Sequence, residues 1–151
     1  MEKVYRSIYM GGLVALLLLL AGGCKKAPIN GKIEGMWKLE EFTTHEDGVT
    51  HPCERIYYSM QLWVVDVAEK QGPNGYKASV GRLVYGEDEQ TVVMKDFHYR
   101  DWTTDSKEPT ALEDLKPYGL NSLETEFKVV KADGKHLILQ SNYATLRLTS
   151  F

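Results

Sequence analysis

The chain has 151 residues with a formal net charge of −3 at pH 7, and this length suits one domain. The mild negative charge and the absence of a Lys/Arg stripe exclude a nucleic-acid surface, and two Cys are too few for a disulfide-stapled scaffold. Nine Tyr and three Trp favour an all-β domain, because aromatic side chains suit a half-buried sheet surface.

The first 24 residues follow the order of a secretion signal. Basic Lys3 and Arg6 precede an apolar run over residues 10–20, and small residues lead directly into Cys24. The run is well short of the roughly 20 residues that a transmembrane helix needs. A Cys in this place resembles a bacterial lipobox, although Ala21 stands where that motif prefers Leu. The resemblance implies that Cys24 is diacylated and begins the mature protein; the alternative is an ordinary signal peptide with Cys24 retained.

The predicted organisation is a lipoprotein signal peptide over residues 1–23, a short lipid-anchored tether over 24–32 and one domain over 33–151. Lys25 and Lys26 follow the lipobox Cys. They are neither the Asp that resembles an inner-membrane retention signal nor an acidic run that resembles a surface-export signal. The resemblance therefore implies a cell-envelope address, anchored through lipid in the outer membrane and facing the periplasm.

The folded domain opens with Gly35-Met-Trp37 directly after the tether. Gly-x-Trp at the start of a first strand resembles lipocalins and their bacterial lipocalin-like relatives. That resemblance implies that Trp37 plugs one end of a β-barrel, while Gly35 lets the backbone pass close to it. The alternative is that Trp37 is an ordinary core aromatic.

Seven strands and one helix are predicted along the rest of the chain. Alternating or β-rich runs separated by turn residues predict strands over 37–44, 57–67, 76–85, 91–99, 124–131, 136–140 and 143–150. Asp47-Gly48 predicts a turn within the loop 45–52, and the run 101–110 predicts a polar loop. Thr110 and Glu113 have the spacing of a capping box for a short helix over 111–118. Gly119 suits the end of that helix.

Short connections without βαβ alternation predict an all-β, antiparallel, up-and-down barrel of about eight strands. The layout resembles that of small lipocalin-like lipoproteins of Bacteroidetes-type bacteria, many with no assigned function. In lipocalins an Arg from the last strand packs over the barrel-end Trp, and the resemblance implies that Arg147 forms this pair with Trp37. The alternative is that Arg147 is a solvent-facing charge on an alternating strand.

A search for catalytic and metal motifs yields little. No phosphate loop, Gly-x-Ser-x-Gly, His-Glu-x-x-His or Cys-x-x-Cys is present, so no cofactor and no enzymatic activity are predicted. The best metal ligand set is His45, His51 and Cys53, but a solvated loop is the preferred interpretation, so no metal site is predicted. Asp96 and His98 fall on one strand face, where a satisfied polar pair is favoured over a catalytic one. The acidic clusters at 46–47 and 87–89 lack the spacing of a calcium loop.

A ligand pocket is the most specific functional hypothesis. Barrel mouths are favoured ligand sites, and aromatic residues on alternating positions are candidates for lining one. These candidates are Trp63, Tyr85, Phe97, Tyr99 and Trp102. The sequence predicts a non-enzymatic binder of a small apolar or amphipathic ligand; the alternatives are a filled barrel acting as an accessory or protein-interaction module, and an enzyme working inside the barrel.

Overall fold

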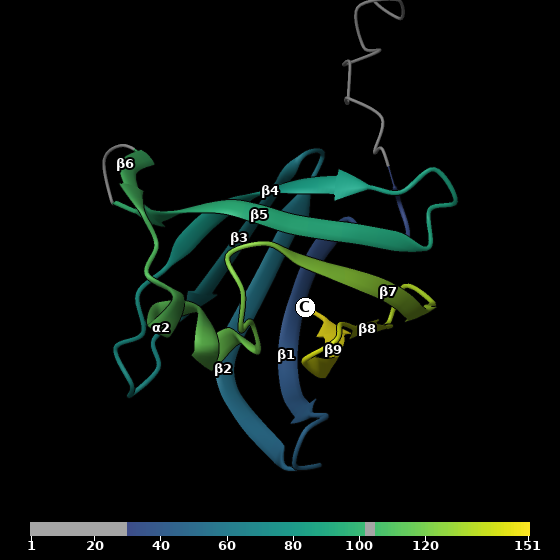
Figure 1. Cartoon of the computed structure of the whole chain (residues 1–151), viewed down its shortest axis with the longest axis horizontal. Coiled ribbons are helices and arrows are strands. Elements are labelled where there is room, and N and C mark those ends of the chain that lie inside the picture. The colour runs from purple at the N-terminus through teal and green to yellow at the C-terminus, as the bar shows by residue number, and fades with distance from the viewer. Residues whose placement is uncertain (1–29, 102–104) are drawn as a thin grey trace, which may run out of the picture.

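The computed structural model describes residues 30–101 and 105–151 as an antiparallel β-barrel (Figure 1). Its strands are β1 (Gly35–Thr44), β2 (Thr50–Gln61), β3 (Val64–Glu69), β4 (Ser79–Tyr85), β5 (Thr91–Arg100), β6 (Asp105–Pro109), β7 (Thr125–Ala132), β8 (His136–Gln140) and β9 (Ala144–Ser150). A short helix α2 (Leu112–Leu115) and a 3₁₀ turn η1 (Lys116–Tyr118) separate β6 from β7. No helix among the described residues is long and apolar enough to cross a membrane.

The barrel closes through pairing of its first and last strands. The order is β4-β3-β2-β1-β9-β8-β7-β5, and β4 also pairs with β5. Eight strands therefore form a closed ring of neighbours, and each follows its neighbour in the chain, with β6, α2 and η1 inserted between β5 and β7. Closure removes the unpaired sheet edges that otherwise invite aggregation. The predicted up-and-down barrel with one short helix near 111–118 is confirmed.

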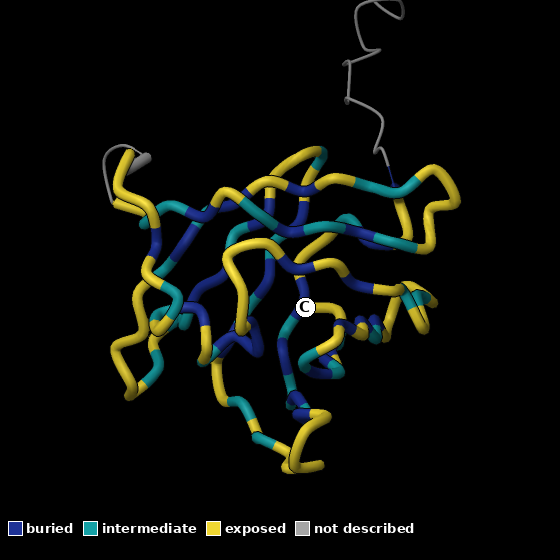
Figure 2. The backbone as a smooth tube through the Cα atoms, in the orientation of Figure 1, coloured by how far each residue is buried: buried dark blue, intermediate teal, exposed yellow. Residues whose placement is uncertain are grey.

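The barrel interior is packed with side chains. Strands β1, β2 and β9 alternate between buried and more exposed positions, which places every second residue in one continuous core (Figure 2). The largest fully buried side chains include Tyr58, Tyr118 and Phe127. An eight-stranded barrel is just wide enough for side chains to fill it, and the aromatic residues of this chain do so.

One predicted strand is two strands. The run 57–67 contains a tight turn at Leu62 and Trp63, so β2 ends at Gln61 and β3 begins at Val64. Leu62 adopts a positive φ of 55°, which an apolar branched residue seldom does. The turn has none of the Gly, Asn, Asp or Pro residues that signal a turn, and for that reason the sequence pattern missed it.

A bulge reverses the alternation within β5. Asp96 has a φ of 54°, and the β4–β5 register shifts between Val80 and Arg82. Val92 and Met94 face the core before the bulge and Phe97 faces it afterwards. Strict alternation along β5 would place Met94 and Phe97 on opposite faces, but the one extra residue shifts the side-chain period of two and both face the core.

The helix begins without the predicted cap. The N-cap position is Ala111, and no side chain caps the first turn. Thr110 is buried and its hydroxyl donates a hydrogen bond to Ser79 Oγ at 2.9 Å, so it joins the helix to β4 instead. The predicted helix end is confirmed, since Gly119 has a left-handed φ of 78° and donates its N–H to Lys116 O at 2.9 Å.

The barrel has two different ends. We call the end that holds the start of β1, the β2–β3 turn and the β4–β5 turn the closed end. We call the opposite end, with the β1–β2 loop, the β3–β4 connection, α2, η1 and the β8–β9 turn, the open end. Trp37 lies at the closed end, 3% exposed, and its Nε1–H donates to Ile33 O at 2.7 Å.

Candidate functional site

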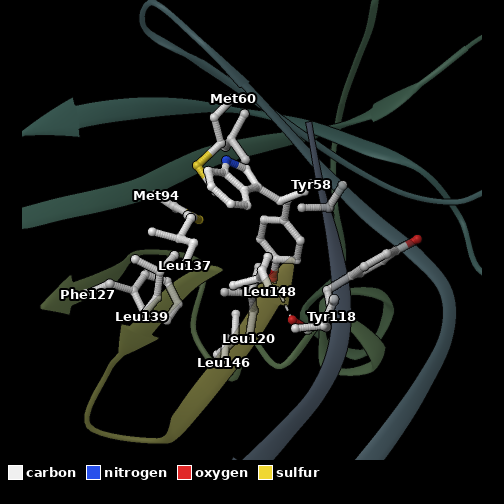
Figure 3. Packing of buried hydrophobic residues seen from close by; sticks show 14 of the residues in the cluster. Tyr58, Met60, Met94, Tyr118, Leu120, Phe127, Leu137, Leu139, Leu146 and Leu148 are labelled. Carbon is white, nitrogen blue, oxygen red and sulfur yellow. Dashed lines mark hydrogen bonds between the residues drawn. The ribbon is translucent and has the colours of Figure 1, made fainter. Parts of the chain in front are cut away.

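The segment from α2 to Leu120 plugs the open end of the barrel. Leu115, Tyr118 and Leu120 are fully buried in the core. The Tyr58 hydroxyl donates to Tyr118 O at 2.5 Å (Figure 3). The Tyr118 hydroxyl donates to Lys77 O at 2.8 Å. These contacts tie the plug to β2 and to the chain just before β4, so apolar side chains fill the interior up to this end.

Gly119 allows the plug to pack closely against the barrel strands. A Cβ atom at Gly119 would lie 3.1 Å from Cγ of Phe42 and 3.4 Å from Cδ1 of Leu146. Its positive φ also disfavours any other residue. Gly119 thus combines the helix end with a close approach to β1 and β9.

Two buried tyrosine hydroxyls hold the plug, Tyr58 on β2 and Tyr118 within the plug itself. Burial raises the pKa of Tyr58 and of Tyr118 well above the ordinary value for tyrosine. Both therefore remain neutral donors near neutral pH. Their hydrogen bonds end on backbone carbonyls, so their role here is to hold the plug in place.

A groove of about 540 Å³ lies between the plug and the strands of the open end. Its walls come from four parts of the chain: the end of β1 with the start of β2, the β3–β4 connection, η1 and the β8–β9 turn. The lining residues are Phe42, His51, Pro52, Cys53, Glu54, Ile56, Pro73, Asn74, Tyr76, Lys116, Pro117 and Tyr143. Aromatic rings and prolines dominate this set, with one acidic and one basic side chain.

The groove holds no activated nucleophile among its lining residues. Burial first, and the nearby Glu41 and Glu40 carboxylates next, raise the pKa of Cys53 to about 11. The residue is therefore a thiol near neutral pH, with its Sγ 3.6 Å from His51 O. The His51 ring stacks on Phe42 at a centroid distance of 4.7 Å. Within the described residues, Cys53 thus contacts the backbone of His51 and not its ring.

The lipocalin-like domain family matches residues 17–151 of the chain. The chain belongs to this family. A lipocalin-like protein from Bacteroides uniformis ATCC 8492 is similar in structure, with a TM-score of 0.58 and 16% identity over 80% of this chain and 100% of that chain. An uncharacterized protein from Bacteroides eggerthii DSM 20697 has a TM-score of 0.57 and 15% identity over 78% of this chain and 98% of that one. A search of curated proteins finds no match.

In this lipocalin-like domain, Trp37 and Arg147 do not form the expected pair. Trp37 points into the core, whereas Arg147 points outward between buried Leu146 and Leu148. The Arg147 Nε lies 3.4 Å from Glu41 Oε1, its neighbour across β1 and β9. Arg147 is therefore a solvent-facing charge on an alternating strand, which was the alternative interpretation from the sequence.

The expected ligand residues are spread over the lipocalin-like barrel. Trp63 is 53% exposed in the β2–β3 turn, where its ring lies 5.9 Å from that of Tyr85 at the closed end. Phe97 is buried in the core. The Tyr99 hydroxyl donates to Asp114 Oδ2 at 2.6 Å beside α2, and Tyr99 and Trp63 both border a shallow outer groove of about 310 Å³. The four candidates that the structure describes thus do not converge on one interior pocket. Trp102 lies outside the described residues, as does Cys24.

The possible metal ligands of the loop are held apart. His45 contacts Thr145 Oγ1 at 2.8 Å through Nε2, whereas His51 stacks on Phe42. Within residues 30–101 and 105–151, no three His, Cys, Asp or Glu side chains gather as a metal site. His98 Nδ1 meets the backbone oxygen of Asp96 at 2.9 Å, not its carboxylate.

Sequence reasoning missed most of the groove. Tyr76, Tyr143 and Pro117 were not singled out, although each stands beside a predicted turn or helix end. Aromatic and proline residues next to connections at the same barrel end are the signal that points to them. Only the order of the strands shows which connections meet at that end.

Proposed function

We propose that this lipocalin-like domain binds a small apolar or amphipathic ligand in the open-end groove and does not catalyse a reaction on it. The observation that carries the proposal is the groove itself. Its volume of about 540 Å³ falls in the range typical of small-molecule sites. The fold adds support, because eight-stranded barrels of this kind include binders of one small ligand.

The groove favours an amphipathic ligand over a purely apolar one, because its exposed lining combines aromatic rings with a larger polar surface. Tyr76 and Tyr143 offer accessible ring surfaces, whereas Phe42 and Ile56 line the groove as buried residues. At the rim, Lys116 pairs with Glu113 at 2.7 Å, so the charge at this point of the rim is balanced. A neutral or zwitterionic head group therefore suits the rim better than a highly charged one.

The address of the protein is part of the same proposal. The order of charge, apolar run, small residues and Cys24 supports a lipid anchor in the outer membrane, facing the periplasm. Substitution Cys24→Ala should release the protein from the membrane fraction of its host. If the variant stays with the membranes, attachment through Cys24 is wrong.

A second function is favoured by one observation, the filled interior. A barrel that holds its own side chains where a ligand cavity would lie can act through its surface, as an accessory or protein-interaction module. This alternative predicts that no small molecule copurifies and that the groove stays empty when ligands are offered.

Native mass spectrometry of residues 25–151, purified gently from periplasm, separates the two functions. A bound small molecule supports the binder. An unliganded mass that persists after incubation with envelope lipid extract supports the interaction module. Occupancy can be located with Cys53, because a ligand in the groove should slow alkylation of this thiol.

Matched variants tie a bound mass to the groove. Tyr76 lines the groove, whereas Tyr57 lies outside it, 4.8 Å from the ring of Phe151. Tyr76→Ala should weaken ligand retention and reduce the protection of Cys53, and Tyr57→Ala should leave both unchanged. Equal effects of the two substitutions contradict binding in the groove.

A further inference from the structure

The chain is fixed to the closed end of the barrel from Asn30 onward. Asn30 is 3% exposed, and its N–H donates to Glu34 Oε1 at 3.1 Å. Asn30 O accepts the N–H groups of Ile33 and Glu34. Cys24 is six residues before Asn30, and six residues span at most about 20 Å. A lipid on Cys24 therefore keeps the closed end within about 20 Å of the bilayer surface.

Apolar side chains are exposed at this same end. Trp63 is 53% exposed, Val64 is 47% exposed and Val84 is 39% exposed. We call these three residues the closed-end patch. Gly35 pairs with Met60, which places the start of β1 beside the β2–β3 turn that carries Trp63. The exposed turn is visible in Figure 2 and its place between β2 and β3 in Figure 1.

The patch is continuous across two strands. Val64 pairs with Arg82, so Val64 and Val84 are diagonal neighbours on the outer face of β3 and β4. The shallow outer groove of about 310 Å³ runs along this face and is bordered by Trp63 and Val64. Arg82 is exposed beside both valines and forms no ion pair with a residue that the structure describes.

This combination fits the interfacial region of a membrane. Trp has an apolar body and one N–H donor, and it concentrates where a bilayer meets water. An Arg beside apolar side chains can reach lipid phosphates while its stem covers the apolar surface. The neighbouring β4–β5 turn carries Glu87, Asp88 and Glu89, so a strongly anionic surface suits this end poorly.

We propose that the closed-end patch docks on a zwitterionic phospholipid bilayer, with Trp63 in the headgroup region and Arg82 at the phosphates. The proposal rests on the lipid anchor at Cys24, which brings this end of the barrel to the membrane. Docking fixes the orientation of the domain relative to the bilayer as well as its distance from the bilayer. Ten residues of β1 at a tilt of about 40° rise roughly 25 Å, so the open-end groove faces away from the bilayer.

The test uses the full-length lipoprotein reconstituted in zwitterionic phosphatidylethanolamine and phosphatidylcholine vesicles, with and without bromine on the acyl chains. Bromine quenches tryptophan fluorescence only at close range. The wild-type chain should lose emission in the brominated vesicles, and Trp63→Phe should reduce that loss. If bromine removes the same amount of tryptophan emission from the wild-type chain and from Trp63→Phe, Trp63 does not touch lipid and the proposal is overturned.

Two matched valines show whether the patch matters. Val64→Glu places a charge in the patch and should reduce the quenching of Trp63. Val49→Glu changes a valine with 45% exposure in the open-end β1–β2 loop and should leave the quenching unchanged. Equal quenching in the two variants overturns docking through this face.

Flotation of the vesicles tests the anchor separately. The variant Cys24→Ala is combined with Val64→Glu, so that neither the lipid nor an intact patch holds the chain. If this double variant floats as well as Val64→Glu alone, attachment through Cys24 fails, while the quenching of Trp63 still decides whether the closed end touches lipid. A patch covered by a second copy or by a protein partner leaves Trp63 unquenched in brominated vesicles, which also overturns the proposal.

Discussion

Substitution Trp37→Ala should destabilise the barrel far more than the same substitution at Trp63. Trp37 is 3% exposed, belongs to the continuous core and donates its indole N–H to Ile33 O at 2.7 Å. Removal of a buried Trp ring costs about 3–5 kcal/mol in the free energy of unfolding, because it removes apolar contacts and leaves a cavity. The whole free energy of unfolding of a domain of this size is about 5–15 kcal/mol, so the loss is a large share of its stability.

Trp63→Ala is the matched control, because it also replaces a Trp by Ala but at an exposed position. Trp63 is 53% exposed and its main ring contact is Tyr85 at 5.9 Å. Loss of such an aromatic pair costs about 0.5–1.5 kcal/mol. Trp37→Phe keeps one aromatic ring in the core but removes part of the packing together with the donor to Ile33 O, whose loss alone costs about 1–3 kcal/mol.

Urea unfolding followed by circular dichroism measures these differences. The midpoint should fall most for Trp37→Ala, less for Trp37→Phe and least for Trp63→Ala, with similar slopes if the transition stays two-state. A loss below about 1 kcal/mol for Trp37→Ala would show that the buried ring does not hold the closed end together, and the reasoning from burial would fail.

Three further predictions concern single groups. Alkylation of Cys53 should be slow at pH 8 and accelerate by about tenfold per pH unit up to its pKa of about 11, because the thiolate is the nucleophile; a rate already constant at pH 8 contradicts the raised pKa. Arg147→Ala should change the free energy of unfolding by about 1 kcal/mol or less, since its ion pair with Glu41 is exposed. If urea unfolding shows a larger loss of stability, Arg147 has a structural role after all. Tyr58→Phe should cost about 1–3 kcal/mol, because Tyr118 O loses its buried donor, and an unchanged urea midpoint would show that this bond does not hold the plug.

The fold was predictable because its signals are local. Alternation along β1 and β9, the turn at Gly48 and the helix end at Gly119 each follow from a few neighbouring residues. Two features escaped because residues adopt conformations that their types seldom favour. Leu62 turns the chain with a positive φ, and Asp96 inserts a bulge that changes which residues face the core.

The candidate site was much less predictable, because it depends on which connections meet. Phe42, Tyr76, Pro117 and Tyr143 are spread over about a hundred positions of the sequence and come together only at the open end. The expected pairing of Trp37 with Arg147 failed for a related reason. The strand register places Arg147 opposite Glu41, and this register cannot be read from the sequence alone.

The energetics of the plug decide where a ligand can bind. Withdrawal of the plug exposes Leu115 and Leu120, at about 1.5–3 kcal/mol each. It also breaks the hydrogen bonds from Tyr58 and Tyr118, at a net cost of about 0.5–1.5 kcal/mol each. The sum is at least about 4 kcal/mol, and every 1.4 kcal/mol is tenfold, so the unplugged barrel is populated about once in a thousand molecules or less. A ligand that needed the interior would lose about that factor in affinity, whereas the open-end groove requires no such change, and binding on the rim is therefore favoured over binding inside the barrel.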